Sequence, residues 1–245
     1  DYDKRTIEQD MKTLRERQES LRQRSGSTEV TGEAGDLEGA AEQVREFSGE
    51  TVTANSTLSE YLARCMLGQT GLIDLTGVPG SGDADLVADA LLEAYYQNPL
   101  ILGLQGYRIN KDATKLKITY EEDAAEAAKK QQEIKAKVSE VTAEIITPGM
   151  TDLERELAIN SYLCDTIEYD MAALENAEQY NYAKTDPEFN DSFTAYGALL
   201  KGKCVCAGYA AAFKLLADSA GLESIVVTGM LEGTMSHAWN KVKLD

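Results

Sequence analysis

Residues 203–245 carry three short motifs in order, Cys206-Ala-Gly-Tyr-Ala210, Ser224-Ile-Val-Val-Thr228 and Ser236-His-Ala-Trp-Asn240. His237 is the only histidine of the chain, and Trp239 is its only tryptophan. A thiol and an imidazole are the minimum parts for nucleophilic catalysis by cysteine, because the thiolate attacks and a base must take its proton. Cys206 and His237 are therefore the first candidates for a reactive pair.

The residues after Cys206 have the spacing of a helix, and Gly221 marks its end. The apolar residues of one helical face are Tyr209, Phe213, Leu216 and Ala220. Cys206 then falls in the first turn, where unpaired N–H groups and the helix dipole favour a thiolate.

Residues 236–244 alternate as a strand. One side carries His237, Trp239, Lys241 and Lys243, and the other carries Ala238, Val242 and Leu244. Asn240 points away from His237. A buried cysteine and a hydrogen-bonded core histidine fit the same residues, so the pattern alone leaves both interpretations open.

The order C-x-G-Y-A-x-x-F, a strand and then H-A-W-N-x-V-x-L resembles the bacterial transglutaminase-like (papain-like) superfamily. Segments upstream resemble the early helix and the pre-cysteine part of that family. They are Met150-Thr-Asp-Leu-Glu154, Ile159-Asn-Ser-Tyr-Leu163, Ile167-Glu-Tyr-Asp170 and Thr194-Ala-Tyr-Gly-Ala-Leu199. The resemblance extends over roughly residues 120–245.

The resemblance implies an α+β fold in which the helix bearing Cys206 packs on an antiparallel sheet. It makes Cys206 the nucleophile and His237 the base of a catalytic triad. The third member is usually an Asp on the following strand, beyond Asp245. We therefore expect the chain to be truncated, cleaved or incompletely represented, and to turn over poorly as given. A second departure is Cys204, where the family usually has Gly or Ala.

The chemistry implied is attack on a peptide bond or a glutamine-type amide, through a thioester acyl-enzyme released by water or by an amine. The oxyanion donors would be the Cys206 main-chain N–H and a side chain, for which we name Tyr196. Trp239 would shield the pair or pack the strand. The expected partner is a protein or peptide substrate. We expect no cofactor and no metal, and the oligomeric state stays open.

Two other functions remain as alternatives. The first is a non-catalytic binding or scaffolding module that keeps the fold. The second is a redox role for Cys204 and Cys206, which ranks last because bridging them would need a strained small ring.

The amino-acid composition limits the kinds of partner that we expect. The chain has 24 basic and 42 acidic residues and a net charge of −18, which argues against nucleic acid and against an anionic membrane surface. It contains no apolar run long enough to cross a bilayer. Bacterial enzymes of this resemblance are often exported, so we expect an extracellular or cell-surface protein of a bacterium. The first residue is Asp, which indicates a processed or engineered fragment.

Three regions are expected. Residues 1–57 would form an N-terminal helix (1–24) and a linker with a possible short helix (36–47). Residues 58–120 would form a small α+β scaffold domain, and residues 121–245 the transglutaminase-like domain.

Periodicity predicts helices at 58–68, 83–96 and 121–146, and a fourth that opens at the capping box Thr151-Asp-Leu-Glu154. Strands are predicted at 101–103, 105–109 and 115–120, the last two as a hairpin. Residues 176–191 are predicted as a surface loop, with overhang of the cleft as the alternative. Cys65 and Cys164 are predicted in the core.

Overall fold

The computed structural model describes residues 51–180, 182, 184–231 and 235–244. The two helices predicted within residues 1–50 lie outside this range. Helices and small sheets mix along the chain, as the α+β prediction requires.

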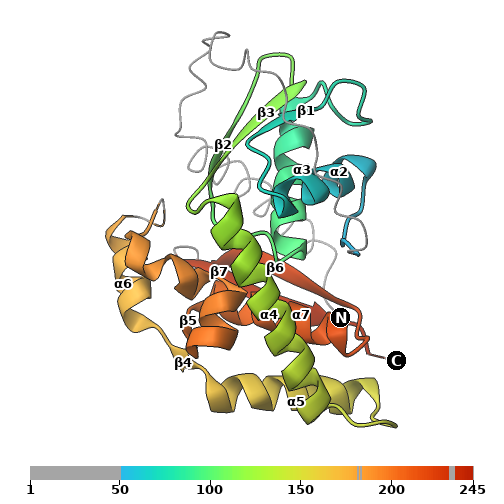
Figure 1. The fold of residues 1–245 in the computed structure, drawn as a ribbon, viewed down its shortest axis with the longest axis vertical. Helices are drawn as coiled ribbons and strands as arrows, with labels where there is room; N and C mark the ends of the chain where they lie inside the picture. The colour runs from blue at the N-terminus through green and yellow to red at the C-terminus, as the bar shows by residue number, and fades with distance from the viewer. Residues whose placement is uncertain (1–50, 181, 183, 232–234, 245) are drawn as a thin grey trace, which may run out of the picture.

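The first part is a three-stranded antiparallel sheet packed on two helices (Figure 1). The helices are α2 (Thr57–Leu67) and α3 (Ala84–Gln97). The strands are β1 (Leu72–Asp74), β2 (Leu104–Ile109) and β3 (Lys115–Tyr120), in the order β1-β3-β2. The predicted hairpin is confirmed as β2–β3, whereas 101–103 is not a strand and β1 was not predicted.

Apolar side chains between these helices and strands form one core. Leu62, Met66, Leu91 and Leu116 are fully buried in it. Cys65 is also buried, which confirms its prediction as a core residue.

The second part contains four α-helices and two pairs of strands. The helices are α4 (Ala124–Ile145), α5 (Asp152–Thr166), α6 (Met171–Gln179) and α7 (Cys206–Ser219). Short β4 (Glu168–Tyr169) and β5 (Lys203–Cys204) run parallel, and β6 (Ser224–Leu231) and β7 (Met235–Val242) form an antiparallel hairpin. A 3₁₀ helix, η2 (Pro187–Phe193), and a π-helical turn, η3 (Gly197–Lys201), precede β5.

Helix α7 lies at the centre of this part, with α4 and α5 on one side and the β6–β7 hairpin on the other (Figure 1). Ile134, Ile159 and Leu216 bring α4, α5 and α7 into one core. Ala210 of α7 meets Val226 and Ala238 of the hairpin. The cysteine-bearing helix therefore packs on an antiparallel sheet.

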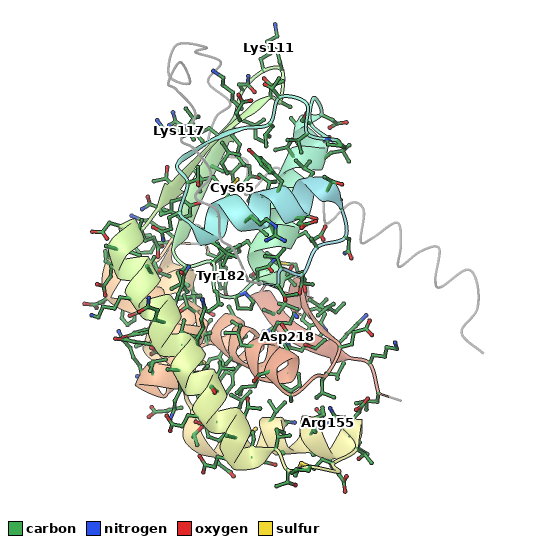
Figure 2. All side chains as sticks on the ribbon, turned by 45° about the vertical axis from the view of Figure 1, so that its right-hand side comes forward. Cys65, Lys111, Lys117, Arg155, Tyr182 and Asp218 are labelled. Carbon is green, nitrogen blue, oxygen red and sulfur yellow. The ribbon has the colours of Figure 1, made fainter. Side chains whose placement is uncertain are left out.

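Two polar contacts hold the long helices in place. Gln131 of α4 donates to the carbonyls of Leu67 and Leu100, at 3.0 and 2.9 Å. Arg155 of α5 donates to the carbonyl of Ala220, after the end of α7, at 2.8 Å (Figure 2). None of the helices within the described residues is long and apolar enough to cross a membrane.

The predicted core position of Cys164 is wrong. Its side chain is exposed, and Leu153 and Leu157 on the same side of α5 are each 51% exposed. The buried side of α5 is set by Ile159 and Leu163, which lie on a different face of the helix.

The predicted loop at 176–191 is only partly a loop. Its start belongs to α6 and its end to η2. Asn176 is buried and exchanges hydrogen bonds with Asp186, donating to its carboxylate at 2.7 Å and accepting from its N–H at 2.9 Å. Tyr180 also donates to Asp186. These contacts close the segment on itself.

Candidate active site

Cys206 is the first residue of α7, as its spacing predicted. The residue before it, Val205, is extended, and its N–H donates to the carbonyl of Ser192 at 2.9 Å. The residue therefore lies at the helix end where main-chain N–H groups lack helical partners.

Gly208 allows this helix start to lie close to the preceding chain. A Cβ at this position would lie 2.5 Å from Cys204 Cβ and 2.9 Å from the Ser192 carbonyl oxygen. Both atoms belong to short, fixed groups, so the C-x-G spacing reflects close packing of α7 on β5 and η2.

Cys204 has the opposite environment to Cys206. It is fully buried, and burial, followed by the charges of Cys206 and Asp170, raises its thiol pKa to about 12. It stays a neutral thiol in the core.

His237 lies on β7, opposite Gly229 of β6. Its ring stacks on Trp239, with centroids 5.9 Å apart and planes inclined by 23°. A Cβ at Gly229 would lie 2.9 Å from Trp239 Cη2. Gly229 therefore leaves the space in which the indole lies across the hairpin beside the imidazole.

A cavity of about 310 Å³ brings these groups together. Its lining includes Cys206, His237 and Trp239, three of the four residues named from the sequence. The other lining residues are Asn160, Leu163, Cys164, Tyr169, Tyr209, Ala210, Phe213, Ala238 and Asn240. The thiol of α7 and the imidazole of β7 thus open into one space.

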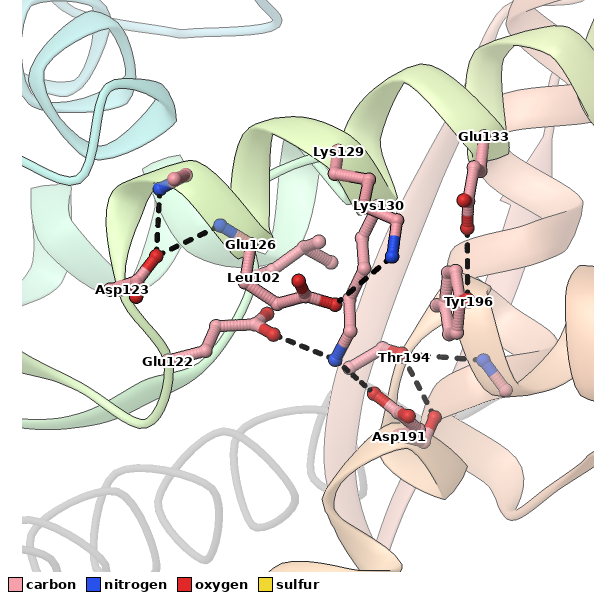
Figure 3. Close-up of polar contacts among 12 residues, drawn as sticks. Leu102, Glu122, Asp123, Glu126, Lys129, Lys130, Glu133, Asp191, Thr194 and Tyr196 are labelled. Carbon is pink, nitrogen blue, oxygen red and sulfur yellow. Dashed lines mark hydrogen bonds and ion pairs between the residues drawn. The ribbon is translucent and has the colours of Figure 1, made fainter.

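Tyr196, the fourth residue, is not part of this lining. Its hydroxyl donates to Glu133 of α4 at 2.9 Å, and Lys130 lies 5.2 Å from its ring centroid (Figure 3). Lys130 also pairs with Glu122 at 2.6 Å and Asp191 at 2.8 Å. The position of Tyr196 fits anchorage of the pre-cysteine segment to α4, and it does not fit an oxyanion donor.

Tyr169 is the tyrosine that reaches Cys206, and we did not single it out from the sequence. The pKa of Tyr169 is raised, first by burial and then by the charge of Cys206, and both residues line the same cavity. Its ring stacks on Tyr209, with centroids 6.2 Å apart. The segment Ile167-Glu-Tyr-Asp170, already part of the family resemblance, was the signal that could have identified it.

Asp170 fixes Tyr169 in this place. Its N–H donates to the Cys204 carbonyl at 2.9 Å, and its carboxylate accepts from Ser192 at 2.7 Å and lies 3.3 Å from Lys203 Nζ. Burial alone would raise the pKa of Asp170, but the hydrogen bonds from Ser192 and the Ala173 N–H, together with Lys203, lower it overall. The ionised carboxylate therefore ties β4 to β5, directly before Cys206.

Two further residues approach the site. Cys164 lines the same cavity, and its thiol donates to Asn160 Oδ1 at 3.4 Å. Tyr182 donates to Glu178 at 3.2 Å. The pKa of Tyr182 is raised by burial, then by Glu178 and by Cys206. Tyr182 belongs to the segment with the predicted overhang, which stays a prediction.

Asn240 points to the opposite side of β7 from His237, as the alternation predicted. It donates to the carbonyl of Ala210 on α7 at 3.0 Å. Among the described residues, no group of three or more His, Cys, Asp or Glu side chains is arranged to hold a metal ion.

Part of the chain is similar to known proteins. Residues 139–245 match the family model of the transglutaminase-like superfamily. The chain is 28% identical over 131 residues to kyphoscoliosis peptidase of Mus musculus, covering 49% of this chain and 18% of that protein. It is 30% identical over 122 residues to kyphoscoliosis peptidase of Homo sapiens, covering 45% and 17%. The chain therefore spans less than a fifth of the length of these relatives.

Proposed function

We propose that this protein is a cysteine enzyme that attacks a peptide or glutamine-type amide through a thioester, because residues 139–245 match the family model of the transglutaminase-like superfamily. The observation that carries the proposal is the shared cavity of Cys206 and His237. One residue comes from the start of a helix and the other from a strand packed beside it, which supports their assignment as a reactive pair.

In the first step His237 accepts the proton of the Cys206 thiol, and the thiolate attacks the substrate carbonyl carbon. The carbonyl oxygen becomes an oxyanion. The Cys206 N–H and the Tyr169 hydroxyl would be the donors for this oxyanion, since Tyr169 and Cys206 line the same cavity. Tyr169 thus takes the role first assigned to Tyr196.

In the second step the oxyanion collapses, the C–N bond breaks, and the leaving amine takes the proton from His237. Cys206 keeps the acyl group as a thioester. Water or a second amine, deprotonated by His237, then attacks the thioester and restores the thiol. The name of the two relatives, a peptidase, supports water as the acceptor.

The cavity indicates the kind of substrate. Leu163, Tyr209, Phe213 and Trp239 give it an apolar and aromatic lining, which suits an apolar side chain next to the reacting carbonyl. The net charge of −18 favours substrates with neutral or basic flanking residues. A bacterial extracellular or cell-surface location also remains a proposal, tested by fractionating the source cells.

The test is hydrolysis of a set of fluorogenic peptides, with and without an added primary amine. We expect turnover that is lost in Cys206→Ala and His237→Ala, while both variants unfold at the wild-type temperature. Intact-mass measurement of the wild type with substrate should show the acyl adduct on Cys206. Turnover that persists in Cys206→Ala would refute the nucleophile assignment. A wild type that binds peptides without cleaving or transferring them would favour the non-catalytic module.

A further inference from the structure

We propose that residues 96–98, at the end of α3, position the hairpin that carries His237 against the helix that carries Cys206. This inference rests on the function proposed above. The three residues, here called the α3 clamp, lie outside the segment that matches the superfamily. They come from the small α+β part of the chain, in which the C-terminal end of α3 contacts β6 (Figure 1).

The side chain of Gln97 binds directly to the β6–β7 hairpin. Its side-chain Nε2 donates to the Val226 carbonyl at 2.8 Å, and its Oε1 accepts from the Val226 N–H at 3.1 Å. Both main-chain groups of a residue in an antiparallel strand point to the same edge. The side chain of Gln97 therefore acts as a one-residue strand partner on the edge of β6 that β7 does not cover.

Further contacts connect Val226 to the residues of the site. Val226 is paired with Asn240 across the hairpin. The Asn240 side chain donates to the carbonyl of Ala210, one turn after Cys206 on α7, at 3.0 Å. A continuous set of contacts thus joins α3, β6, β7 and the start of α7.

Tyr96 fills the space between the same elements. It packs against the cluster of Ala210, Val226 and Ala238, as does Ala207 beside Cys206. Its pKa is raised by burial and then by the charge of Cys206, which agrees with its place near the start of α7. Tyr95 packs edge to face against the Tyr96 ring, with centroids 5.2 Å apart.

Asn98 completes the clamp through the extended segment before α2. It accepts from the Thr53 N–H at 2.8 Å and donates to the Thr53 carbonyl at 2.9 Å. The Thr53 hydroxyl accepts from Lys214 of α7 at 3.4 Å. Lys214 is buried and ion-paired with Asp218 at 2.6 Å (Figure 2). Asn98 therefore links α3 to the back of the helix that carries the nucleophile.

These contacts reach both halves of the reactive pair without touching the reacting atoms. Tyr96, Gln97 and Asn98 are positioning residues. Their loss should allow the hairpin to shift against α7 and so lengthen the path of the proton from Cys206 to His237. Small misplacements of reacting groups are costly to rate, so the chemistry should suffer before the fold does.

The test is Gln97→Met, which keeps the length of the side chain and removes both hydrogen bonds. Gln132→Met, at an exposed position of α4, is the matched control. The pH profile of Cys206 alkylation by iodoacetamide and the kcat and KM of peptide hydrolysis are measured for both, with thermal unfolding alongside. We expect Gln97→Met to lower kcat and the alkylation rate near pH 6 by roughly tenfold with KM little changed, and the control to match the wild type.

A second variant, Gln97→Glu, keeps an acceptor for the Val226 N–H and loses the donor to its carbonyl, so it should fall between the wild type and Gln97→Met. If the wild type itself shows no enhanced alkylation of Cys206 near neutral pH and no turnover, the proposed function fails. If the wild type shows both and Gln97→Met keeps its kcat and its pH profile, the clamp is refuted while the function stands. A loss that only follows the fraction of unfolded protein would also overturn the clamp.

Discussion

Replacing Gly208 by Ala probes how tightly the start of α7 is held. The added methyl carbon would lie 2.5 Å from Cys204 Cβ, 2.9 Å from the Ser192 carbonyl oxygen and 3.0 Å from Cys204 Sγ. None of the three atoms belongs to the end of a long side chain that can swing away. The overlap must move α7, β5 or η2, and each of these elements borders Cys206.

Overpacking of this kind costs about 3 kcal/mol at the upper end of the usual range. Alanine is a better helix former than glycine by ~1 kcal/mol. The net destabilisation is then ~2 kcal/mol, which lowers the melting temperature of a chain of this size by roughly 4–8 °C. The displaced helix start should also slow alkylation of Cys206.

Thermal unfolding followed by circular dichroism measures the first effect, and mass-resolved alkylation measures the second. Gly106→Ala is the control, because a Cβ at Gly106 meets nothing within 4 Å, so it should neither slow alkylation nor reproduce the loss at Gly208. If the Gly208→Ala protein is as stable as the wild type and its Cys206 is alkylated at the same rate, close packing does not require glycine at this position.

Three other outcomes are expected. Tyr169→Phe should lower kcat by ~10²-fold with little change in KM, because one oxyanion donor is lost; unchanged kcat would exclude that role. Because folding lowers the pKa of Asp170, its carboxylate stabilises the fold above about pH 4, and this stabilisation is lost as the pH falls through the folded pKa. Urea titrations should show that Asp170→Asn is less stable than the wild type at neutral pH. The difference in unfolding free energy between the two proteins should disappear in acid. Cys164→Ser should leave the melting temperature unchanged, since the thiol is exposed; a clear loss of stability would show that it is packed.

Several features that the structure confirms were predicted from short, local sequence signals. The capping box at Thr151 and Glu154 forms as predicted, with the Thr151 hydroxyl accepting from the Glu154 N–H and the Glu154 carboxylate accepting from the Thr151 N–H. Cys206 begins a helix, and Gly221 follows its end with a positive φ of 74°. Such features depend on neighbouring residues, so a single sequence contains them.

Features that depend on distant contacts were missed. The strands β4 and β5 have two residues each and exist because they pair with one another in parallel, so no periodicity marks them. Cys164 was assigned to the core because α5 has apolar residues on two faces, and only the packing of α4 and α7 decides which face is buried. Tyr196 and Tyr169 both stand in segments of the family resemblance, and only the fold shows that Tyr169, and not Tyr196, lines the cavity with Cys206. The bonds of Gln97 to Val226 span 129 positions.

The proposed activity depends most on a reactive pair formed by Cys206 and His237. Cys164 offers an internal reference, because it is an exposed thiol that lines the same cavity. The measurement is the iodoacetamide alkylation rate of each cysteine at about pH 6, where an ordinary thiol is almost fully protonated, in the wild type and in His237→Ala. We predict that Cys206 reacts at least tenfold faster than Cys164 in the wild type and loses this advantage in His237→Ala. Equal rates for Cys206 and Cys164 in the wild type would contradict the assignment of Cys206 and His237 as a reactive pair.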